Sequence, residues 1–192
     1  MSLPADRRRY DDGHTRRRME IRRIDGGRPP DAISVRRAVF VDEQGVPEEL
    51  ELDGNDDDAT HFVASDGGRP VGVARLRAYG GGANGHDLGD GTAESGRDTP
   101  SEEATATAEG DAGTTAAAKV ERVAVLAERR GEGIGRELMA AVERAADAAG
   151  YGRLVLHAQV PVVPFYRRLG YEAVGDTFEE ADIPHRRMIK EL

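Results

Sequence analysis

Cysteine is absent from the 192-residue sequence, which excludes disulfide bonds, metal sites built on thiolates and cysteine nucleophiles. Long apolar runs are also missing, because no segment approaches the ~18 residues that a membrane-spanning helix needs. The arginines near the first residue are not followed by an apolar segment, as they would be in a secretory signal. These absences predict a cytoplasmic protein with no membrane partner.

Lysine is scarce, with only Lys119 and Lys190 against 25 arginines. The net charge of −9 argues against a nucleic-acid partner. An acidic surface with few lysines is typical of proteins that work in concentrated salt, where screening weakens the repulsion between carboxylates. A nucleotide composition that favours arginine codons is the alternative explanation, and the sequence leaves both open.

Large apolar side chains are depleted in two segments. Residues 1–18 are rich in Arg and Asp and show no periodicity, which predicts a disordered polar tail. Residues 80–117 are mostly Gly, Ala, Thr, Ser and acidic residues, which bury too little apolar surface to offset the entropy lost on ordering. We expect this low-complexity acidic segment to be a surface insertion in a single domain that spans residues 19–192.

The remaining residues show strand-like and helix-like patterns that predict a mixed α/β sheet. Strands are predicted at residues 19–24, 60–65, 70–79, 118–126, 153–158, 171–178 and 186–192. Helices are predicted at residues 33–41 with Asp31 as N-cap, at 133–149 and at 161–169. The strand–helix–strand unit at residues 120–158 predicts two parallel neighbouring strands joined by a right-handed crossover.

The segment Arg129–Gly135 lies between a predicted strand and the longest predicted helix, and it holds three glycines in five positions. The first N–H groups of a helix have no partner inside it, and the helix dipole adds partial positive charge there. Such a site suits a phosphate or a pyrophosphate, to which Arg129 and Arg130 could add charged contacts.

Three interpretations of this glycine loop compete. A P-loop requires Lys and then Ser or Thr after the last glycine, but Arg136 and Glu137 follow Gly135. A dinucleotide-binding fold requires Gly-x-Gly-x-x-Gly near the start of a βαβ series, whereas this loop is Gly-x-Gly-x-Gly and follows four strands. The third interpretation is a tight strand-to-helix turn that binds no ligand.

The residues Arg130-Gly131-Glu132-Gly133-Ile134-Gly135 resemble the Arg/Gln-x-x-Gly-x-Gly/Ala acyl-CoA motif of the GNAT superfamily of N-acetyltransferases. The preceding segment Glu121–Val125 is similar to the fourth strand of that family. Phe165-Tyr166 with Leu169-Gly170-Tyr171 is similar to its closing segment.

Further segments resemble a branch of small GNAT proteins whose substrates are uncharacterised. They are Ala38–Pro47 followed by Asp53 and His61, Ala158-Gln159, and Ile183-Pro184-His185. The resemblance covers about residues 19–79 and 118–192.

The resemblance implies a mixed, mostly antiparallel sheet of six to seven strands with a central parallel β-α-β acyl-CoA unit and three to four helices. It implies acetyl-CoA as the acetyl donor, with the backbone of Val123, Ala124 and Val125 paired to the pantetheine arm. The other cofactor-binding residues that it implies are Arg129, Arg130, Gly131, Glu132, Gly133, Ile134, Gly135, Gln159 and Tyr166. A β-bulge or splay near Val123–Leu126 is expected if a ligand inserts there.

Acetyl transfer from a thioester to an amine requires a neutral amine, a polarised carbonyl and a protonated leaving thiolate. The resemblance implies direct attack in a ternary complex, which agrees with the absence of cysteine. Tyr166 matches the general acid that protonates the CoA sulfur, and the N–H of Val125 is a candidate donor to the thioester oxygen. The alternative for Tyr166 is a core aromatic residue beside Phe165.

The general base is left open by the sequence. Glu121 could act through water, and Glu43 and His61 are alternatives, although a histidine beside Phe62 is more often structural.

Two further groups of charged residues have more than one interpretation. Arg75 and Arg77 are two residues apart on a predicted strand and face the same way, either toward an acidic acceptor or on a solvated sheet face. Residues 42–58 carry several aspartates and are predicted to be mostly a solvated loop, because their spacing does not fit a calcium site.

The sequence predicts no metal site and identifies neither the amine acceptor, a small molecule or a protein, nor whether the chain is a monomer or a homodimer. A non-catalytic acyl-CoA-binding or regulatory module of the same fold is the alternative function.

Overall fold

The computed structural model of the chain describes residues 19–79 and 116–192, which form a seven-stranded sheet in the order β1-β2-β3-β4-β5-β7-β6. The strands are β1 (Met19–Asp25), β2 (Thr60–Asp66), β3 (Arg69–Tyr79), β4 (Ala117–Val125), β5 (Arg153–Gln159), β6 (Glu172–Glu180) and β7 (Ile183–Glu191). Only β4 and β5 run parallel, and the other neighbours pair antiparallel. The expected mixed sheet is confirmed. The tail at 1–18 and all but the end of the insertion at 80–117 lie outside the described residues.

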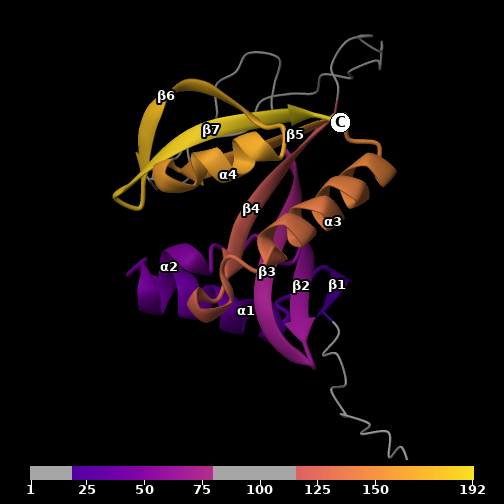
Figure 1. The fold of residues 1–192 in the computed structure, drawn as a ribbon, viewed down its shortest axis with the longest axis vertical. Helices are drawn as coiled ribbons and strands as arrows, with labels where there is room; N and C mark the ends of the chain where they lie inside the picture. Colours follow the sequence, from indigo (N-terminus) through magenta and orange to yellow (C-terminus); the bar gives the residue numbers. More distant parts are fainter. Residues whose placement is uncertain (1–18, 80–115) are drawn as a thin grey trace, which may run out of the picture.

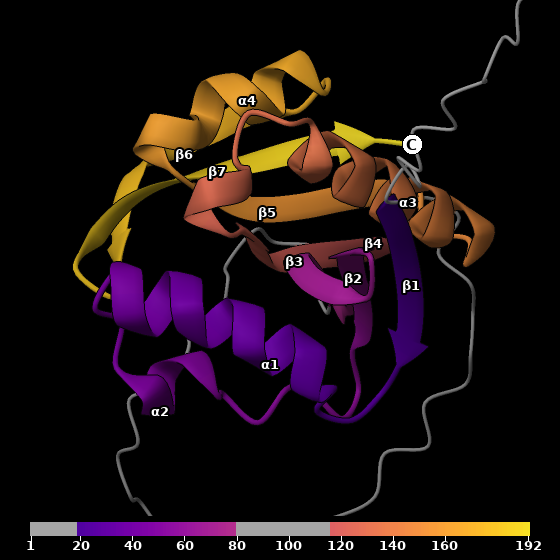
Figure 2. The same ribbon diagram turned by 60° about the horizontal axis from the view of Figure 1, so that its bottom comes forward.

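Helices cover both faces of this sheet (Figure 2). They are α1 (Pro30–Arg36), continued by the π-helical segment η1 (Arg37–Glu43), then α2 (Glu48–Glu51), α3 (Ile134–Ala148) and α4 (Val163–Arg168). Short 3₁₀ turns precede α3 and α4 at Ala127–Arg129 and Val160–Val162. The first three of these segments lie on one face, and α3 and α4 lie on the other (Figure 2). Among the described residues, no helix is long and apolar enough to cross a membrane.

Helix α3 forms because its apolar residues recur at helical spacing and because glycines bound it. Leu138, Met139, Val142 and Ala146 are fully buried against the sheet, while the intervening positions are mostly charged or exposed. The helix ends before Gly150, which has the left-handed φ of +83° that glycine adopts without strain. This end agrees with the predicted one.

The first helix differs from the prediction at both ends. It begins at Pro30, whose fixed φ suits a first turn, and Asp31 lies inside that turn without capping it. Asp31 instead pairs with Arg22 of β1. Beyond Arg36 the chain continues as a π-helix to Glu43, and α2 then interrupts the predicted loop at residues 42–58.

The sheet opens between β4 and β5, beside the residues predicted to bind a ligand. The two strands pair only from Ala117 to Val120, and beyond this point β4 diverges from β5 (Figure 1). On the other side of β4, Val73 faces Ala124 and Arg75 faces Glu121, so two residues of β4 stand opposite one residue of β3. This β-bulge at Arg122 and Val123 turns β4 away from β5. The expected bulge and splay are both present.

Candidate active site

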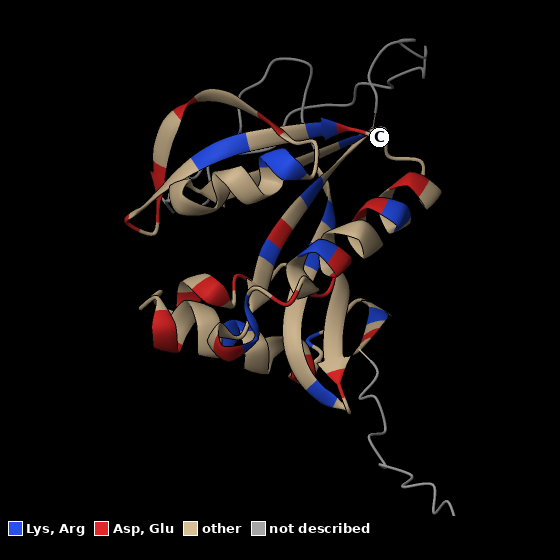
Figure 3. Ribbon diagram, in the orientation of Figure 1, with Lys and Arg blue, Asp and Glu red and all other residues tan. Residues whose placement is uncertain are grey.

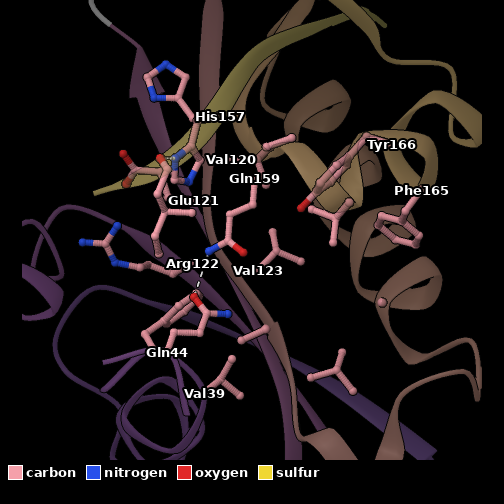
Figure 4. A pocket seen from close by; sticks show the side chains of 18 of the residues that line it. Val39, Gln44, Val120, Glu121, Arg122, Val123, His157, Gln159, Phe165 and Tyr166 are labelled. Atoms are coloured by element: carbon pink, nitrogen blue, oxygen red, sulfur yellow. Dashed lines mark hydrogen bonds between the residues drawn. The ribbon is translucent and has the colours of Figure 1, made fainter. Parts of the chain in front are cut away.

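A cleft of about 1790 Å³ occupies the opening between β4 and β5. Its walls come from the outer half of β4, the end of β5, the start of α3, α4, η1 and the β6–β7 hairpin. Pockets for single small ligands measure roughly 300–1,000 Å³, so this cleft has room for two ligands at once. In Figure 4, Tyr166 and Phe165 lie on one side of it and Glu121, Arg122 and His157 lie on the other.

The glycine loop forms the end of the cleft beneath the N-terminus of α3. Gly131 and Gly133 have φ values of +84° and +88°, and a Cβ atom on either would meet no protein atom within 4 Å. In the described part of the chain, the backbone amides of residues 131–135 have no hydrogen-bond acceptor. The loop therefore presents free N–H groups and the positive end of a helix dipole to an open space, as an anion requires.

The side chains of Arg129 and Arg130 are engaged by carboxylates. Arg129 forms ion pairs with Glu132 at 2.8 Å and with Asp66 at 3.0 Å. Arg130 donates to both oxygens of Glu43, at 2.7 and 2.6 Å, and its Nε donates to the carbonyl oxygen of Val125 at 3.0 Å. The free anion-binding groups of the loop are thus its backbone amides.

The backbone N–H of Val125 points into the cleft. Leu126 donates to the carbonyl oxygen of Val71 at 3.0 Å, which makes these two residues a hydrogen-bonded pair of the β3–β4 ladder. Hydrogen-bonded and non-hydrogen-bonded pairs alternate along antiparallel strands, so Val125, opposite Gly72, turns its N–H and C=O away from β3. They face the side on which β5 has diverged.

Tyr166 lies on α4 with its ring packed edge-on against Phe165 and Tyr171, at centroid distances of 5.0 and 5.9 Å. The side chain is buried, yet it lines the cleft, and its hydroxyl points toward Val123 and Gln159 (Figure 4). Burial raises the pKa of Tyr166, so the phenol keeps its proton at neutral pH. Tyr166 is therefore a core aromatic residue whose protonated hydroxyl also lines the cleft.

Gln159 lies at the end of β5 and bridges the cleft. Its Nε2 donates to Oε1 of Gln44, which follows η1, at 2.8 Å (Figure 4). This hydrogen bond joins the wall made by β5 to the wall made by the first helical segment.

The three candidate bases have different surroundings. Glu121 lines the cleft, and its carboxylate is shared by Arg75 at 2.8 Å, Arg77 at 3.1 Å and Lys119 at 3.5 Å. Glu43 also lines it, but the hydrogen bonds from Arg130 lower the pKa of Glu43, which makes this carboxylate a weaker base.

His61 does not line the cleft. It is fully buried with its Nε2 3.2 Å from the carbonyl oxygen of Asp56. This placement matches the structural interpretation of His61.

Arg75 is fully buried in a network of ion pairs, so the sequence-based alternatives of an acceptor site and a solvated face are both wrong for this residue. Its guanidinium group contacts Asp53 at 2.5 Å and Asp56 at 2.9 Å in addition to Glu121. The prediction of a solvated loop is therefore also wrong for these two aspartates, although Glu48 and Glu49 of α2, an element with acidic positions marked red in Figure 3, are exposed. Burial by itself raises the pKa of Asp53, but the neighbouring arginines outweigh it and hold that pKa well below its usual range.

The network extends to α1 and to the bulge of β4. Arg36 is fully buried and contacts Glu51 at 2.5 Å and Asp56 at 2.6 Å. Arg122 contacts Glu51 at 2.9 Å and Asp53 at 3.1 Å, and it also donates to the carbonyl oxygen of Leu50 at 3.0 Å. The segment at residues 42–58 is therefore fastened to the strand that opens the cleft.

The β6–β7 hairpin lines the cleft with His185, which belongs to the Ile183–His185 segment of the resemblance, and with Phe178 and Glu180, which the sequence did not single out. Nδ1 of His157 lies 2.9 Å from the carboxylate of Glu180, and the ring of Phe178 packs edge-on against His157 and stacks on His185. No local motif marks His157, Phe178 or Glu180, because they lie on β5 and β6, which come together only in the folded sheet. Among the described residues, no group of His, Asp and Glu side chains could hold a metal ion.

Comparisons with known proteins agree with this geometry. The family model described as an acetyltransferase (GNAT) domain matches residues 102–192. The uncharacterized N-acetyltransferase YjcF of Bacillus subtilis is 34% identical over 162 residues, which cover 84% of this chain and 91% of that protein.

Solved structures with the same fold include two acyltransferases of low sequence identity. An acyl-CoA N-acyltransferase from Pseudomonas aeruginosa is similar with a TM-score of 0.63 and 23% identity, over 90% of this chain and 99% of the other. A GNAT family acetyltransferase from Elizabethkingia anophelis with acetyl-CoA bound has a TM-score of 0.57 and 14% identity, over 91% and 98% of the two chains. Sequence and fold together establish that the chain belongs to the GNAT family of acetyltransferases.

Proposed function

We propose that this chain is an acetyl-CoA-dependent N-acetyltransferase that transfers the acetyl group to a primary amine by direct attack in a ternary complex. The observation that carries the proposal is the cleft between β4 and β5, with free amides at one end and the hydroxyl of Tyr166 inside it. The N-acetyltransferase YjcF, the structurally similar acyl-CoA N-acyltransferase of P. aeruginosa and the acetyl-CoA bound to the structurally similar E. anophelis enzyme support it.

The cofactor would lie along the unpaired side of β4. The amides of residues 131–135 would hold the pyrophosphate, with Gly131 and Gly133 leaving room for it. The pantetheine arm would pair with the backbone of Val123, Ala124 and Val125, whose partner strand has diverged. Gln159 would contact the arm once its hydrogen bond to Gln44 is exchanged for one to the cofactor.

In the reaction, the nitrogen of the amine attacks the thioester carbonyl, so that a C–N bond forms and the C–S bond breaks. The N–H of Val125 would donate to the carbonyl oxygen as it becomes negative. The amine would lose its proton to Glu121 through water, and the leaving thiolate would take a proton from Tyr166. Burial raises the pKa of Tyr166, so its phenol carries the proton at neutral pH when the thiolate leaves.

Tyr166→Phe tests the proposal. A general acid contributes about 10²–10⁴-fold, so kcat should fall by that factor while calorimetry shows unchanged acetyl-CoA binding. Tyr171→Phe is the matched control, because this substitution also removes a hydroxyl from a buried tyrosine. The ring of Tyr171 packs on Tyr166 but does not line the cleft. Turnover is followed by release of CoA thiol over a panel of amines in molar salt.

The results separate the proposal from its alternatives. Unchanged turnover in Tyr166→Phe would remove this residue from the acid role. Tight acetyl-CoA binding without acetylation of any amine would favour a non-catalytic acyl-CoA-binding module, and absence of acetyl-CoA binding would contradict both functions.

A further inference from the structure

Two cationic side chains, those of Arg77 and Lys119, lie on the wall of the cleft opposite Tyr166. Arg77 of β3 faces Lys119 of β4, and the side chains are 25% and 18% exposed. Both line the cleft, and within the described residues Glu121 is the only carboxylate within 4 Å of either. Two half-buried cations therefore share one carboxylate.

Glu121 is itself already satisfied by a third cation. Arg75 donates two hydrogen bonds to it, at 3.1 and 2.8 Å, and is fully buried. Arg75 is held from its other side by Asp53 and Asp56, so it cannot turn away from Glu121. Arg77 and Lys119 could thus exchange Glu121 for another anion without leaving that carboxylate unpaired.

Neighbouring residues add to the positive charge of this wall. Arg187 of β7 lies over the ring of Tyr79, 5.8 Å from its centroid, and no carboxylate pairs with it in the described part of the chain. Lys119 also acts electrostatically on Glu180, but that carboxylate is held by His157 at 2.9 Å. Charges in a partly buried wall are screened less than charges in open water, so they attract an anion more strongly.

We infer that the acceptor is an amine joined by a flexible chain to an anionic group, a carboxylate or a phosphate, which binds Arg77 and Lys119. This inference rests on the proposed acetyl transfer and names the substrate class. Glu121 and Val125 are four residues apart on β4, at most about 13 Å of extended strand. The chain between the amine and the anion is therefore no longer than this, and Glu121, which contacts Arg77 and Lys119, can accept a hydrogen bond from the amine or from its water.

The test is a panel of matched acceptors. It contains ω-amino acids from β-alanine to ε-aminocaproate, n-alkylamines of the same lengths, and ω-aminoalkyl phosphates. Comparing the amino acids with the aminoalkyl phosphates shows whether the site prefers a carboxylate or a phosphate. One charged hydrogen bond is worth about tenfold or more, so the anionic acceptors should have a kcat/KM higher than the neutral ones by at least that factor.

The variants Arg77→Gln and Lys119→Gln separate an anion site from a structural role. Each should raise KM for the anionic acceptors about tenfold more than it raises KM for the alkylamines. Arg69→Gln is the matched control on the same strand, because this arginine is exposed, pairs with Glu128 and does not line the cleft. Circular dichroism checks that each variant is folded.

Equal kcat/KM for matched anionic and neutral acceptors would overturn the inference and leave the proposed function intact. An equal rise in KM for both classes in Arg77→Gln and Lys119→Gln would overturn it as well. If no amine is acetylated, the proposed function fails, and calorimetry still decides the anion site. The site would be supported if ε-aminocaproate binds to the complex of the unsubstituted protein with CoA and binds more weakly to that of Arg77→Gln. If ε-aminocaproate does not bind to the unsubstituted protein, the site is excluded.

Discussion

Arg122 supports the bulge of β4 against backbone strain, and its replacement should destabilise the fold. The residue has a left-handed φ of +53°, which costs roughly 1–2 kcal/mol for any residue with a Cβ atom. Its side chain is 19% exposed and pairs with Glu51 and Asp53. Loss of a buried ion pair costs about 3–5 kcal/mol. Because both partners keep another arginine, Arg122→Ala should cost about 3 kcal/mol, the lower end of that range.

Glycine at the same position makes the prediction sharper. Arg122→Gly loses the same ion pairs but relieves the strain, so it should be about 1 kcal/mol more stable than Arg122→Ala. At an ordinary strand position glycine is less stable than alanine, so this reversed order is a signature of the strained bulge.

The free energy of unfolding is measured in urea by far-UV circular dichroism, because the chain has no tryptophan. Arg153→Ala is the control, since Arg153 of β5 forms an exposed ion pair with Glu191 and should cost no more than about 1 kcal/mol. An alanine variant of Arg122 that is as stable as its glycine variant, or as the Arg153 control, would refute the reasoning.

Two further predictions concern the cofactor loop and acid stability. Gly133→Ala places a Cβ atom at φ +88°, and the strain of about 1–2 kcal/mol should weaken CoA binding about tenfold by calorimetry. Gly150→Ala carries similar strain at the other end of α3 and should leave CoA binding unchanged, so equal losses would contradict the role of the loop. Hydrogen bonding to His157 lowers the pKa of Glu180 from 4.5 to about 2, so its contribution to stability is present above pH 4.5 and lost as the pH falls toward 2. The difference in free energy of unfolding between the unsubstituted protein and Glu180→Gln, measured in urea, should shrink as the pH falls over that interval. A difference that stays constant would show that the pairing of Glu180 with His157 does not contribute to stability.

Local sequence patterns were sufficient for the elements that carry the proposed cofactor site. The apolar stripe of α3, the glycines before it and Gly150 after it depend on neighbours within a few residues, so their conformations could be predicted from the chain alone. The parallel pairing of β4 and β5 followed as well, because a strand–helix–strand unit joins parallel neighbours through a crossover with one favoured hand.

Contacts between distant segments could not be predicted in the same way. Asp53 and Asp56 look like loop residues in the sequence, and only the approach of Arg36, Arg75 and Arg122 from other elements makes their burial favourable. A buried carboxylate is stable only with a partner, and nothing in the local sequence shows which partner arrives.

The amino-acid sequence by itself determined the family, the order of the elements and the glycine loop, because these depend on motifs and on short-range periodicity. The tertiary structure alone decided which charged residues face the cleft. It buried Arg75 among aspartates, paired Glu43 with Arg130 and left Arg77 and Lys119 on the cleft wall with one shared carboxylate. The physical reason is that a charge acquires its role from the charges that folding brings within a few ångströms of it.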